Sequence, residues 1–407
     1  MIRTRTGDCK THAATIGRAD RGLDWLNLFV ANIQTGFGPF LAVYLATKGW
    51  TQTAIGVALS LGTLTAMASQ VPAGALVDAV RFKSVVAALS VVVFSISALL
   101  FAVYPTPLFV YLAEIMHGFA SCTLGPAIAA MSLIVAGQAR LSLRLGRNVR
   151  YASLGNGIGA ALMGACGYYV SNQAVFFLTS CLTLPALAAL VPLSRLDVRV
   201  GRRPLADAAP PQKISHVLAN RALLIFAAAA MLFTLANAAL LPLASVALTR
   251  RAPDIASLLI AACVVLPQVI VALFSPWVGG LAEARGRRSA LILGFLMLPL
   301  RGLLFAILTS PFLVVMVQAL DGVAAASFGI MVPLVAADVA GRSGHFNLAL
   351  GFIGFCIGIG STLGTTLAGM VADRFGDQVA FAVLAAVGAA ATVLVWQGMP
   401  ETRLPSA

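Results

Sequence analysis

Three charged side chains fall inside long apolar runs of this sequence: Glu114, Arg301 and Asp321. An ionised side chain at the centre of a lipid bilayer costs roughly 2.5–3.5 kcal/mol on insertion scales, so each one marks a candidate functional site. If the two later runs are helices that cross a ~30 Å hydrocarbon core, Arg301 lies about 18 Å from one face and Asp321 about 14 Å from the other. We therefore predict that Arg301 and Asp321 form an ion pair at the same depth.

A proton can compete with Arg301 for the carboxylate of Asp321. Protonation would break the pair, remove a buried negative charge and allow the helices to rearrange. The alternative is a permanent structural pair, in which each side chain only neutralises the other. The sequence supports the two interpretations about equally.

Glu114 and His117 form a second candidate site, because residues three apart lie on one face of a helix. Removing a carboxylate from water favours its protonated form, so Glu114 could carry protons. His117 corresponds to Asp321 when Gly118 and Gly322 are aligned. The alternative is that Glu114, only about 10 Å from one face, lies in a water-filled vestibule without a coupling role.

Neutral amides inside the apolar runs are the candidates for contacts with a bound solute. An amide between helices more often joins the helices to each other, and this alternative applies to each of them. The candidates are Asn32, Gln34, Asn237, Gln268 and Gln318.

The composition places these residues in a membrane protein. The chain has 407 residues, of which 60% are hydrophobic and only 10% charged, against about 25% charged in soluble domains. A spanning helix needs about 20 apolar residues, and the runs are continuous rather than alternating, which excludes a strand barrel. We predict an all-α polytopic membrane protein with twelve spans, at 23–46, 52–77, 84–104, 108–136, 148–170, 174–194, 222–247, 255–278, 289–309, 312–338, 347–371 and 378–398.

One pattern between two apolar runs occurs twice, which indicates two parallel copies of a six-helix unit. The first copy contains Gly74, Asp78, Arg81 and Lys83, and the second contains Gly279, Glu283, Arg285, Arg287 and Arg288. The same offset superimposes Gly155, Gly159 and Gly164 on Gly360, Gly364 and Gly369. The predicted organisation is a tail (1–22), a first bundle (23–194), a linker rich in Arg and Pro (195–221), a second bundle (222–398) and a tail (399–407).

Basic residues fall mostly on one side of the predicted spans. Of the 27 Lys and Arg, 22 lie on the side of the N-terminus, four on the other side and Arg301 inside a span. The positive-inside rule therefore predicts that both termini are cytoplasmic. The net charge of +13 is then expected to contact anionic lipid headgroups rather than nucleic acid. Residues 1–22 lack the apolar core of a signal peptide, so the first span should direct insertion.

Sequence motifs for enzymatic chemistry are absent. The six cysteines are scattered without a CxxC pair, which favours buried packing residues over a metal or redox site. A nucleotide-binding loop and a Ser-His-Asp set at matching depth are also absent. We therefore expect neither an enzyme nor a cofactor, and expect the energy to come from an ion gradient.

The twelve runs in two halves, the basic linker and the repeated motif resemble the major facilitator superfamily (MFS) of secondary transporters. The resemblance implies two six-helix bundles whose first and fourth spans line a central cavity. It also implies that the motif carboxylates, Asp78 and Glu283, pair with nearby Arg and Lys to form a cytoplasmic gate. In the first copy, Arg81 replaces the usual glycine. The alternative is a surface ion pair worth under ~1 kcal/mol.

Other family motifs match only in part. Glu114 stands where the family has an intramembrane arginine, so the role of that arginine cannot be transferred. Gly155, Gly159 and Gly164 are spaced like an exporter motif, but duplicated packing explains them equally. The Arg301 and Asp321 arrangement is similar to that of lactose-type proton symporters.

We therefore expect a proton-coupled transporter of the bacterial-type inner (plasma) membrane that exports a small organic solute in exchange for protons by alternating access. A solute:proton symporter is the alternative, and a membrane sensor that lost transport is a different class. The expected partners are a small-molecule substrate, protons and membrane lipid, and the chain is expected to be a monomer.

Overall fold

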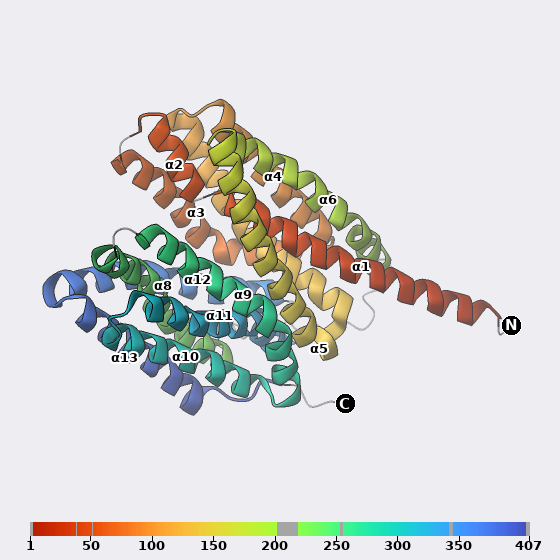
Figure 1. Ribbon diagram of the computed structural model, residues 1–407. Helices are drawn as coiled ribbons and strands as arrows, with labels where there is room; N and C mark the ends of the chain where they lie inside the picture. The colour runs from red at the N-terminus through yellow and green to blue at the C-terminus, as the bar shows by residue number, and fades with distance from the viewer. Residues whose placement is uncertain are drawn as a thin grey trace. The chain divides into compact units, whose positions relative to one another are not determined.

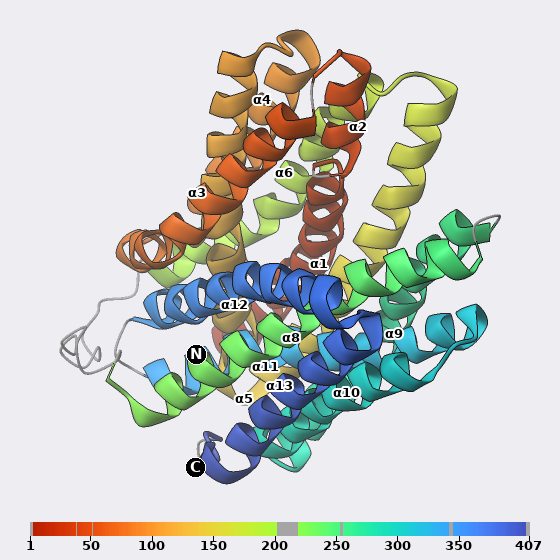
Figure 2. The ribbon, with the colours of Figure 1, turned by 90° about the vertical axis from the view of Figure 1, so that its left-hand side faces the viewer.

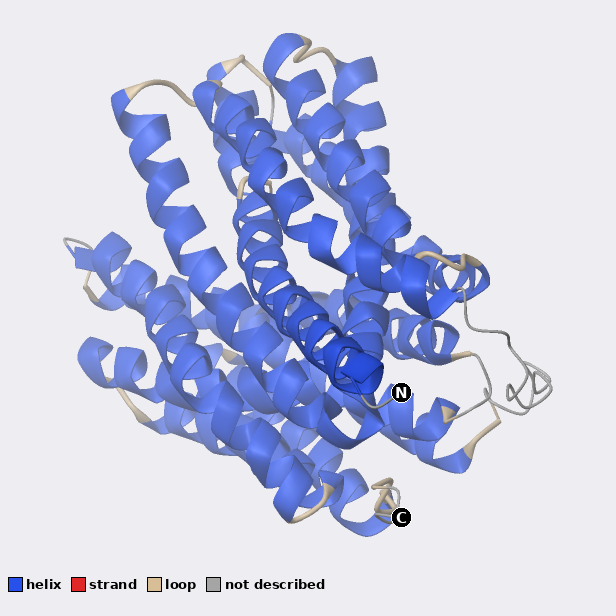
Figure 3. Ribbon diagram, turned by 90° about the vertical axis from the view of Figure 1, so that its right-hand side faces the viewer, coloured by secondary structure: helices blue, strands red, loops and turns tan. Residues whose placement is uncertain are grey.

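The computed structural model describes residues 3–37, 39–50, 52–201, 219–252, 255–341 and 345–403. Within these ranges the chain forms helices and loops without a strand (Figure 3). The prediction of an all-helical protein is confirmed. Of the predicted segments, residues 202–218 of the linker and the ends of both tails lie outside the described residues.

The helices of the described residues carry the labels α1 to α6 and α8 to α13 in Figures 1 and 2. The first six are α1 (Arg3–Thr35), α2 (Pro39–Thr47), α3 (Gln52–Ala79), α4 (Lys83–Val103), α5 (Pro107–Tyr169) and α6 (Ala174–Gly201). The others are α8 (Arg221–Arg251), α9 (Ala256–Ala284), α10 (Arg287–Ile307), α11 (Pro311–Ala340), α12 (Phe346–Phe375) and α13 (Asp377–Gly398).

The chain divides into two compact units. The first comprises Met1–Leu141 and Tyr151–Pro210, and the second comprises Ser142–Arg150 and Pro211–Ala407. The short segment Ser142–Arg150 of α5 therefore groups with the second unit. The division of the sequence into bundles at 195–221 remains a prediction.

Every predicted span falls on a helix, but helices and spans do not correspond one to one. Within the described ranges, nine helices are long and apolar enough to cross a membrane. Helix α5 covers two predicted spans, and Gly137 between them has a left-handed backbone with φ of 67°. The first predicted span is divided between α1, which ends at Thr35, and α2, which begins at Pro39, since proline is favoured at the first position of a helix. The number of twelve crossings remains a prediction.

The core of the first unit is built around α6, which packs against α1 and α4 (Figure 1). Phe176 of α6 contacts Tyr44 and Phe101, with ring centroids 5.1 and 5.6 Å apart, respectively. All three side chains are almost fully buried. These rings fix the ends of α2, α4 and α6 against one another.

Glycines allow equivalent helices to approach closely in each unit. A Cβ added to Gly155 of α5 would collide with the carbonyl oxygen of Leu28 in α1. In the second unit, a Cβ on Gly360 of α12 would collide with the carbonyl oxygen of Met231 in α8. Figure 2 shows α8 and α12 side by side.

A second pair of glycines repeats this correspondence. A Cβ on Gly118 of α5 would lie 2.5 Å from the carbonyl oxygen of Gly62 in α3, and a Cβ on Gly322 of α11 would lie 2.8 Å from that of Pro267 in α9. Gly118 and Gly322 occupy the same position in the two copies of the repeat. The helices that they contact, α3 and α9, also occupy the same position in the two copies. The internal packing of the two units follows the predicted duplication.

Replacing Gly364 by Ala should destabilise the protein, because the new methyl group would meet the carbonyl oxygen of Leu235 in α8. Overpacking of this kind typically costs about 1–3 kcal/mol. Gly369, on the same helix, has open space around it, and Ala favours a helix over Gly by about 1 kcal/mol. Unfolding in detergent, followed by intrinsic fluorescence, should therefore show a lower midpoint for Gly364→Ala and an unchanged or higher one for Gly369→Ala. Equal midpoints for both variants would contradict the close approach.

Candidate functional site

The predicted ion pair between Arg301 and Asp321 is present in the second unit. Arg301 lies on α10 and Asp321 on α11, and the two helices are joined by a short turn. Nη1 of Arg301 donates a hydrogen bond to Oδ1 of Asp321. The same nitrogen donates to Oδ1 of Asn237 on α8 at 2.7 Å. Three helices therefore hold one guanidinium group.

The two partners of this pair differ in their access to solvent. The Arg301 side chain is 2% exposed, and that of Asp321 is 22% exposed. The guanidinium carbon of Arg301 lies 5.5 Å from the centre of the Phe305 ring, and its Nε has no hydrogen-bond partner among the described residues. A guanidinium group does not lose its proton in a protein. The enclosed positive charge of Arg301 therefore depends on Asp321 as its counter-charge.

Gln318 lies one turn before Asp321 on α11 and is fully buried. Its amide faces the thiol of Cys263, and it forms no hydrogen bond of ordinary geometry with the described residues. A buried amide without a partner is rare in folded proteins and is available to a ligand or a water molecule. We call Asn237, Arg301, Gln318 and Asp321 the Arg301 cluster.

In the first unit, α5 brings Glu114 and His117 together as the sequence predicts. Nδ1 of His117 lies 3.8 Å from Oε2 of Glu114. The His117 ring stacks on Phe37 with centroids 4.1 Å apart, and it meets Phe94 edge-on at 5.4 Å. Glu114 is 2% exposed, and its Oε1 has no partner among the described residues. The Glu114 carboxylate is therefore enclosed, whereas the His117 side chain beside it is 20% exposed; we call this pair the Glu114 site.

A glycine on α3 makes room for this carboxylate. A Cβ on Gly62 would collide with the carboxylate of Glu114. The sequence did not point to Gly62 or to Phe37 as parts of the site. In the sequence, Gly62 stands out only as a glycine within an apolar run. The residue that it contacts on the neighbouring helix is determined by the fold.

The remaining amide candidates are distributed differently. Asn32 is buried against Gly159, where a Cβ would lie 2.8 Å from its Oδ1. Its Nδ2 donates a long hydrogen bond of 3.4 Å to the carbonyl oxygen of Leu28. Gln34 is exposed, and Gln268 is half-buried on α9. Asn32 thus serves the packing of α1 on α5, and only Asn237 and Gln318 belong to the Arg301 cluster.

The first copy of the repeated motif closes the end of α3. Nζ of Lys83 donates to the carbonyl oxygens of Val77, Asp78 and Val80 at 2.6, 3.1 and 2.7 Å. These carbonyls lack partners within their own helix, and a cation near a helix C-terminus stabilises it. Lys83 therefore acts as a helix cap, and the guanidinium group of Arg81 lies 5.7 Å from the centre of the Phe82 ring.

In the second copy, the arginine pairs outside the motif. Nε of Arg287 donates to Oδ2 of Asp338 on α11 at 2.9 Å. Glu283 contacts Ser142, whose Oγ donates to Oε2 at 2.7 Å, and its expected pairing with a nearby Arg or Lys stays a prediction. Glu401 accepts hydrogen bonds from the backbone N–H of Arg287 at 2.9 Å and so caps the start of α10. The sequence did not reveal Asp338 or Glu401 as partners.

The remaining motif residues have simpler surroundings. Arg288 bonds the carbonyl oxygen of Trp396, while Arg285 ends α9 as its C-cap residue. A Cβ on Gly279 would lie 2.7 Å from the carbonyl oxygen of Ser142, and Gly74 lies inside α3. Among the described residues, no group of three His, Cys, Asp or Glu is placed to hold a metal ion.

Long apolar helices in two units of corresponding packing, with a buried ion pair, define a multi-pass membrane protein. The profile of the Major Facilitator Superfamily matches residues 25–263 and again residues 227–406. The chain belongs to this superfamily and is an MFS-type transporter, not an enzyme.

Relatives and solved structures agree with this assignment. Two proteins from strains of Mycobacterium tuberculosis, each named as an uncharacterized MFS-type transporter, are 33% identical over 401 residues, which is 96% of both chains. The human organic anion transporter MFSD10 (TETRAN) has a similar fold, with a TM-score of 0.70 at 14% identity over 93% of this chain and 99% of its own. FucP in its outward conformation gives 0.67 at 15% identity over 94% and 97%. At these identities the solved structures show the fold alone.

Replacing Asp321 by Asn should destabilise the protein more than replacing Arg301 by Gln. Asp321→Asn leaves an enclosed guanidinium group without its counter-charge, and breaking a buried pair from one side costs about 3–5 kcal/mol. Arg301→Gln leaves a carboxylate that is partly exposed and can be hydrated or protonated. The midpoint of thermal unfolding in detergent compares the two variants.

The double variant serves as the control for this prediction. Arg301→Gln/Asp321→Asn removes both charges and should recover most of the loss seen with Asp321→Asn. Equal destabilisation by the two single substitutions would contradict the assignment of Arg301 as the enclosed partner.

Proposed function

We propose that this MFS-type transporter is proton-coupled and moves a small organic solute by alternating access, with Asp321 as its main proton site. One observation carries the proposal: Asp321 is the partner with access to solvent, while Arg301 is enclosed. A proton can therefore reach the carboxylate without first displacing the arginine. Protonation removes the charge that balances Arg301 and changes which helix positions are stable.

The Glu114 site is proposed as a second proton site. Its carboxylate is buried, and its Oε1 has no partner among the described residues, so this oxygen is open to a proton or to a hydrogen-bond donor of a solute. His117, at 3.8 Å from Glu114, can share a proton with it. Glu114 and His117 occupy the positions in the repeat that Gln318 and Asp321 occupy in the second unit.

Exchange of solute for protons follows if both compete for the same carboxylates. A solute with hydrogen-bond donors or a positive charge would bind ionised Asp321 or Glu114, and a proton would displace it. With protons entering down their gradient, this competition exports the solute. The amides of Gln318 and Asn237 are proposed to orient the solute beside Asp321. Asn32 and Gln34 of the first unit and Gln268 of the second stay separate proposals from the sequence, each within its own unit.

Symport is the second candidate, and the geometry of Arg301 favours it for anionic solutes. Protonation of Asp321 leaves the Arg301 guanidinium bound only to Asn237 by the contacts described. An anionic group on a solute could then take the place of the carboxylate, so proton and solute would bind together. The sign of the solute charge therefore distinguishes the two modes.

The proposed setting is the inner membrane of a bacterium, with both termini in the cytoplasm. The distribution of 22 basic residues on one side and four on the other supports this orientation, and the relatives from Mycobacterium support the setting. We propose that the protein works as a monomer, and that the two copies of the repeated motif act as cytoplasmic gates.

Transport should change the pH inside proteoliposomes that contain the dye pyranine. Tetraphenylphosphonium, para-aminohippurate and chloramphenicol represent cationic, anionic and neutral organic solutes, and radiolabel reports their uptake. Antiport predicts that an added solute enters while the interior becomes more alkaline, whereas symport predicts acidification. Uptake without a pH change would contradict proton coupling, and no uptake from any class would contradict the proposed range of solutes.

Substituting the proposed proton sites should uncouple uptake from protons. For a solute that is transported, Asp321→Asn should lower proton-driven uptake at least tenfold, and Glu114→Gln should lower it by a smaller factor. Asp373→Asn is the matched control, because this carboxylate is exposed near the end of α12. Unchanged proton-driven uptake in both site variants would show that neither carboxylate is the coupling site.

A further inference from the structure

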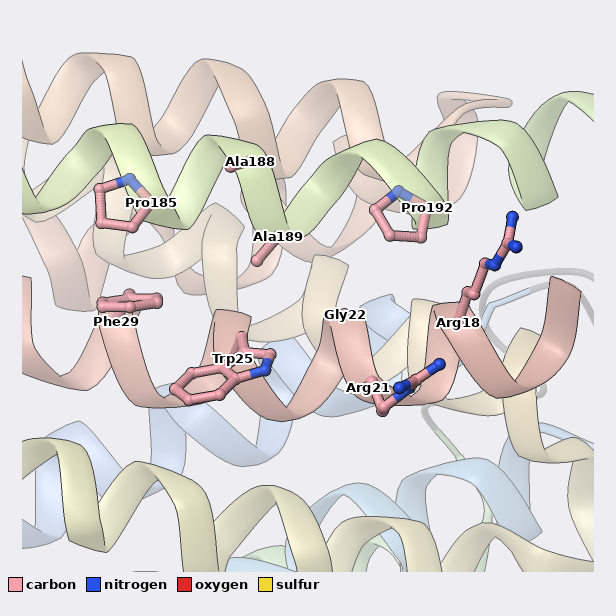
Figure 4. A pocket seen from close by; sticks show the side chains of 9 residues that line it. All are labelled: Arg18, Arg21, Gly22, Trp25, Phe29, Pro185, Ala188, Ala189 and Pro192. Atoms are coloured by element: carbon pink, nitrogen blue, oxygen red, sulfur yellow. The ribbon is translucent and has the colours of Figure 1, made fainter. Parts of the chain in front are cut away.

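A groove on the first unit lies between α1 and α6, apart from both polar sites (Figure 4). Its volume is about 580 Å³. The lining residues are small or apolar along most of its length and basic at one end. They are Arg18, Arg21, Gly22, Trp25, Phe29, Pro185, Ala188, Ala189 and Pro192.

The close approach of the two helices forms the floor of this groove. A Cβ on Gly22 would lie 2.8 Å from the carbonyl oxygen of Ala189, so only glycine fits this approach. Ala188 adds little bulk beside it. Figure 4 shows Pro185 and Pro192 pointing from α6 toward α1. The result is a shallow channel with apolar walls, which suits an elongated apolar chain.

The charges on the groove are of one sign. Arg18 and Arg21 are exposed, and they lie at the end of the groove nearest the N-terminus of α1. The nearby acids of α1, Asp20 and Asp24, are not among the lining residues, and both have interactions of their own. An anionic group at this end of the groove would meet two guanidinium groups, whereas a cationic group would be repelled.

The spacing of the lining residues matches an amphiphile that lies along α1. Phe29 lies eleven positions after Arg18, which is about 16 Å along a helix. Trp25 is 52% exposed, and tryptophan is enriched at membrane interfaces. With the predicted span beginning at residue 23, Arg18 is expected at the level of the headgroups and Phe29 at the level of the hydrocarbon. This order, basic then aromatic then apolar, complements the phosphate, the glycerol region and the acyl chain of a phospholipid.

We propose that this groove binds one anionic phospholipid from the leaflet at the N-terminal end of α1. The phosphate binds Arg18 and Arg21, since guanidinium groups form paired, charge-assisted hydrogen bonds with phosphate oxygens. One acyl chain lies along Gly22 and Ala189 between the walls of Trp25 and Pro185. A zwitterionic lipid carries a choline cation that the two arginines repel, so the groove selects by headgroup charge.

Quenching of Trp25 fluorescence tests this proposal directly. Phe replaces Trp50, Trp277 and Trp396, the other three tryptophans of the chain, and the protein is placed in vesicles with brominated phosphatidylglycerol or brominated phosphatidylcholine at equal mole fraction. Brominated phosphatidylglycerol should quench Trp25 at least twice as strongly. Equal quenching by the two lipids would overturn the proposal.

Two arginine variants separate a specific site from general charge attraction. Arg18→Gln/Arg21→Gln should remove the preference for phosphatidylglycerol. Arg140→Gln/Arg150→Gln changes the net charge equally at exposed positions that do not line the groove, and it should keep the preference. Loss of preference in both variants would indicate general attraction and would overturn the site.

A second measurement avoids the tryptophan substitutions, should the single-tryptophan protein fail to fold. Native mass spectrometry of the full chain with phosphatidylglycerol should show one retained lipid that phosphatidylcholine does not replace. Arg18→Gln/Arg21→Gln should lower this retention at least fivefold. Retention unchanged by that substitution would place the lipid elsewhere and contradict the assignment.

Discussion

The enclosed guanidinium group of Arg301 is the constraint on which the site depends. A cation that cannot lose its proton is stable in an apolar bundle only with a counter-charge and hydrogen-bond acceptors close by. Asp321 supplies the charge and Asn237 supplies an acceptor from a third helix. Because Asp321 is the more exposed partner of this ion pair, a proton that neutralises its carboxylate removes the counter-charge that links α10 and α11.

Close helix packing makes such polar groups possible in a mostly apolar protein. Gly62 leaves space for the carboxylate of Glu114, and Gly118 brings α5 against α3 at the same level. In the second unit, Gly322 brings α11 against α9 one residue after Asp321. Gly118 directly follows His117, and Gly322 directly follows Asp321. The duplicated packing therefore places a titratable residue beside a close helix contact in each unit.

Sequence alone predicted the features that depend on local pattern or membrane depth. The all-helical class followed from the apolar runs, and the Arg301 and Asp321 pair followed from two opposite charges at the same depth in neighbouring runs. Asp338 and Glu401 were not predicted, because their partner Arg287 is distant in the sequence and meets them only in the fold. The contacts of Lys83 with the backbone carbonyls at the end of α3 were not predicted either, because they depend on the course of the chain after the helix; the gate pairing of the motif carboxylates stays a prediction.

The central claim is that Asp321 gains and loses a proton while Arg301 stays charged and enclosed. Infrared difference spectroscopy, with the protein in lipid and with Asp321→Asn as the reference, observes the protonated carboxyl group of this residue directly. The proposed function predicts that its band grows as the pH falls, over the same pH range in which proton-driven transport changes. A carboxylate that remains ionised throughout that range would contradict the claim and leave the pair a permanent structural element.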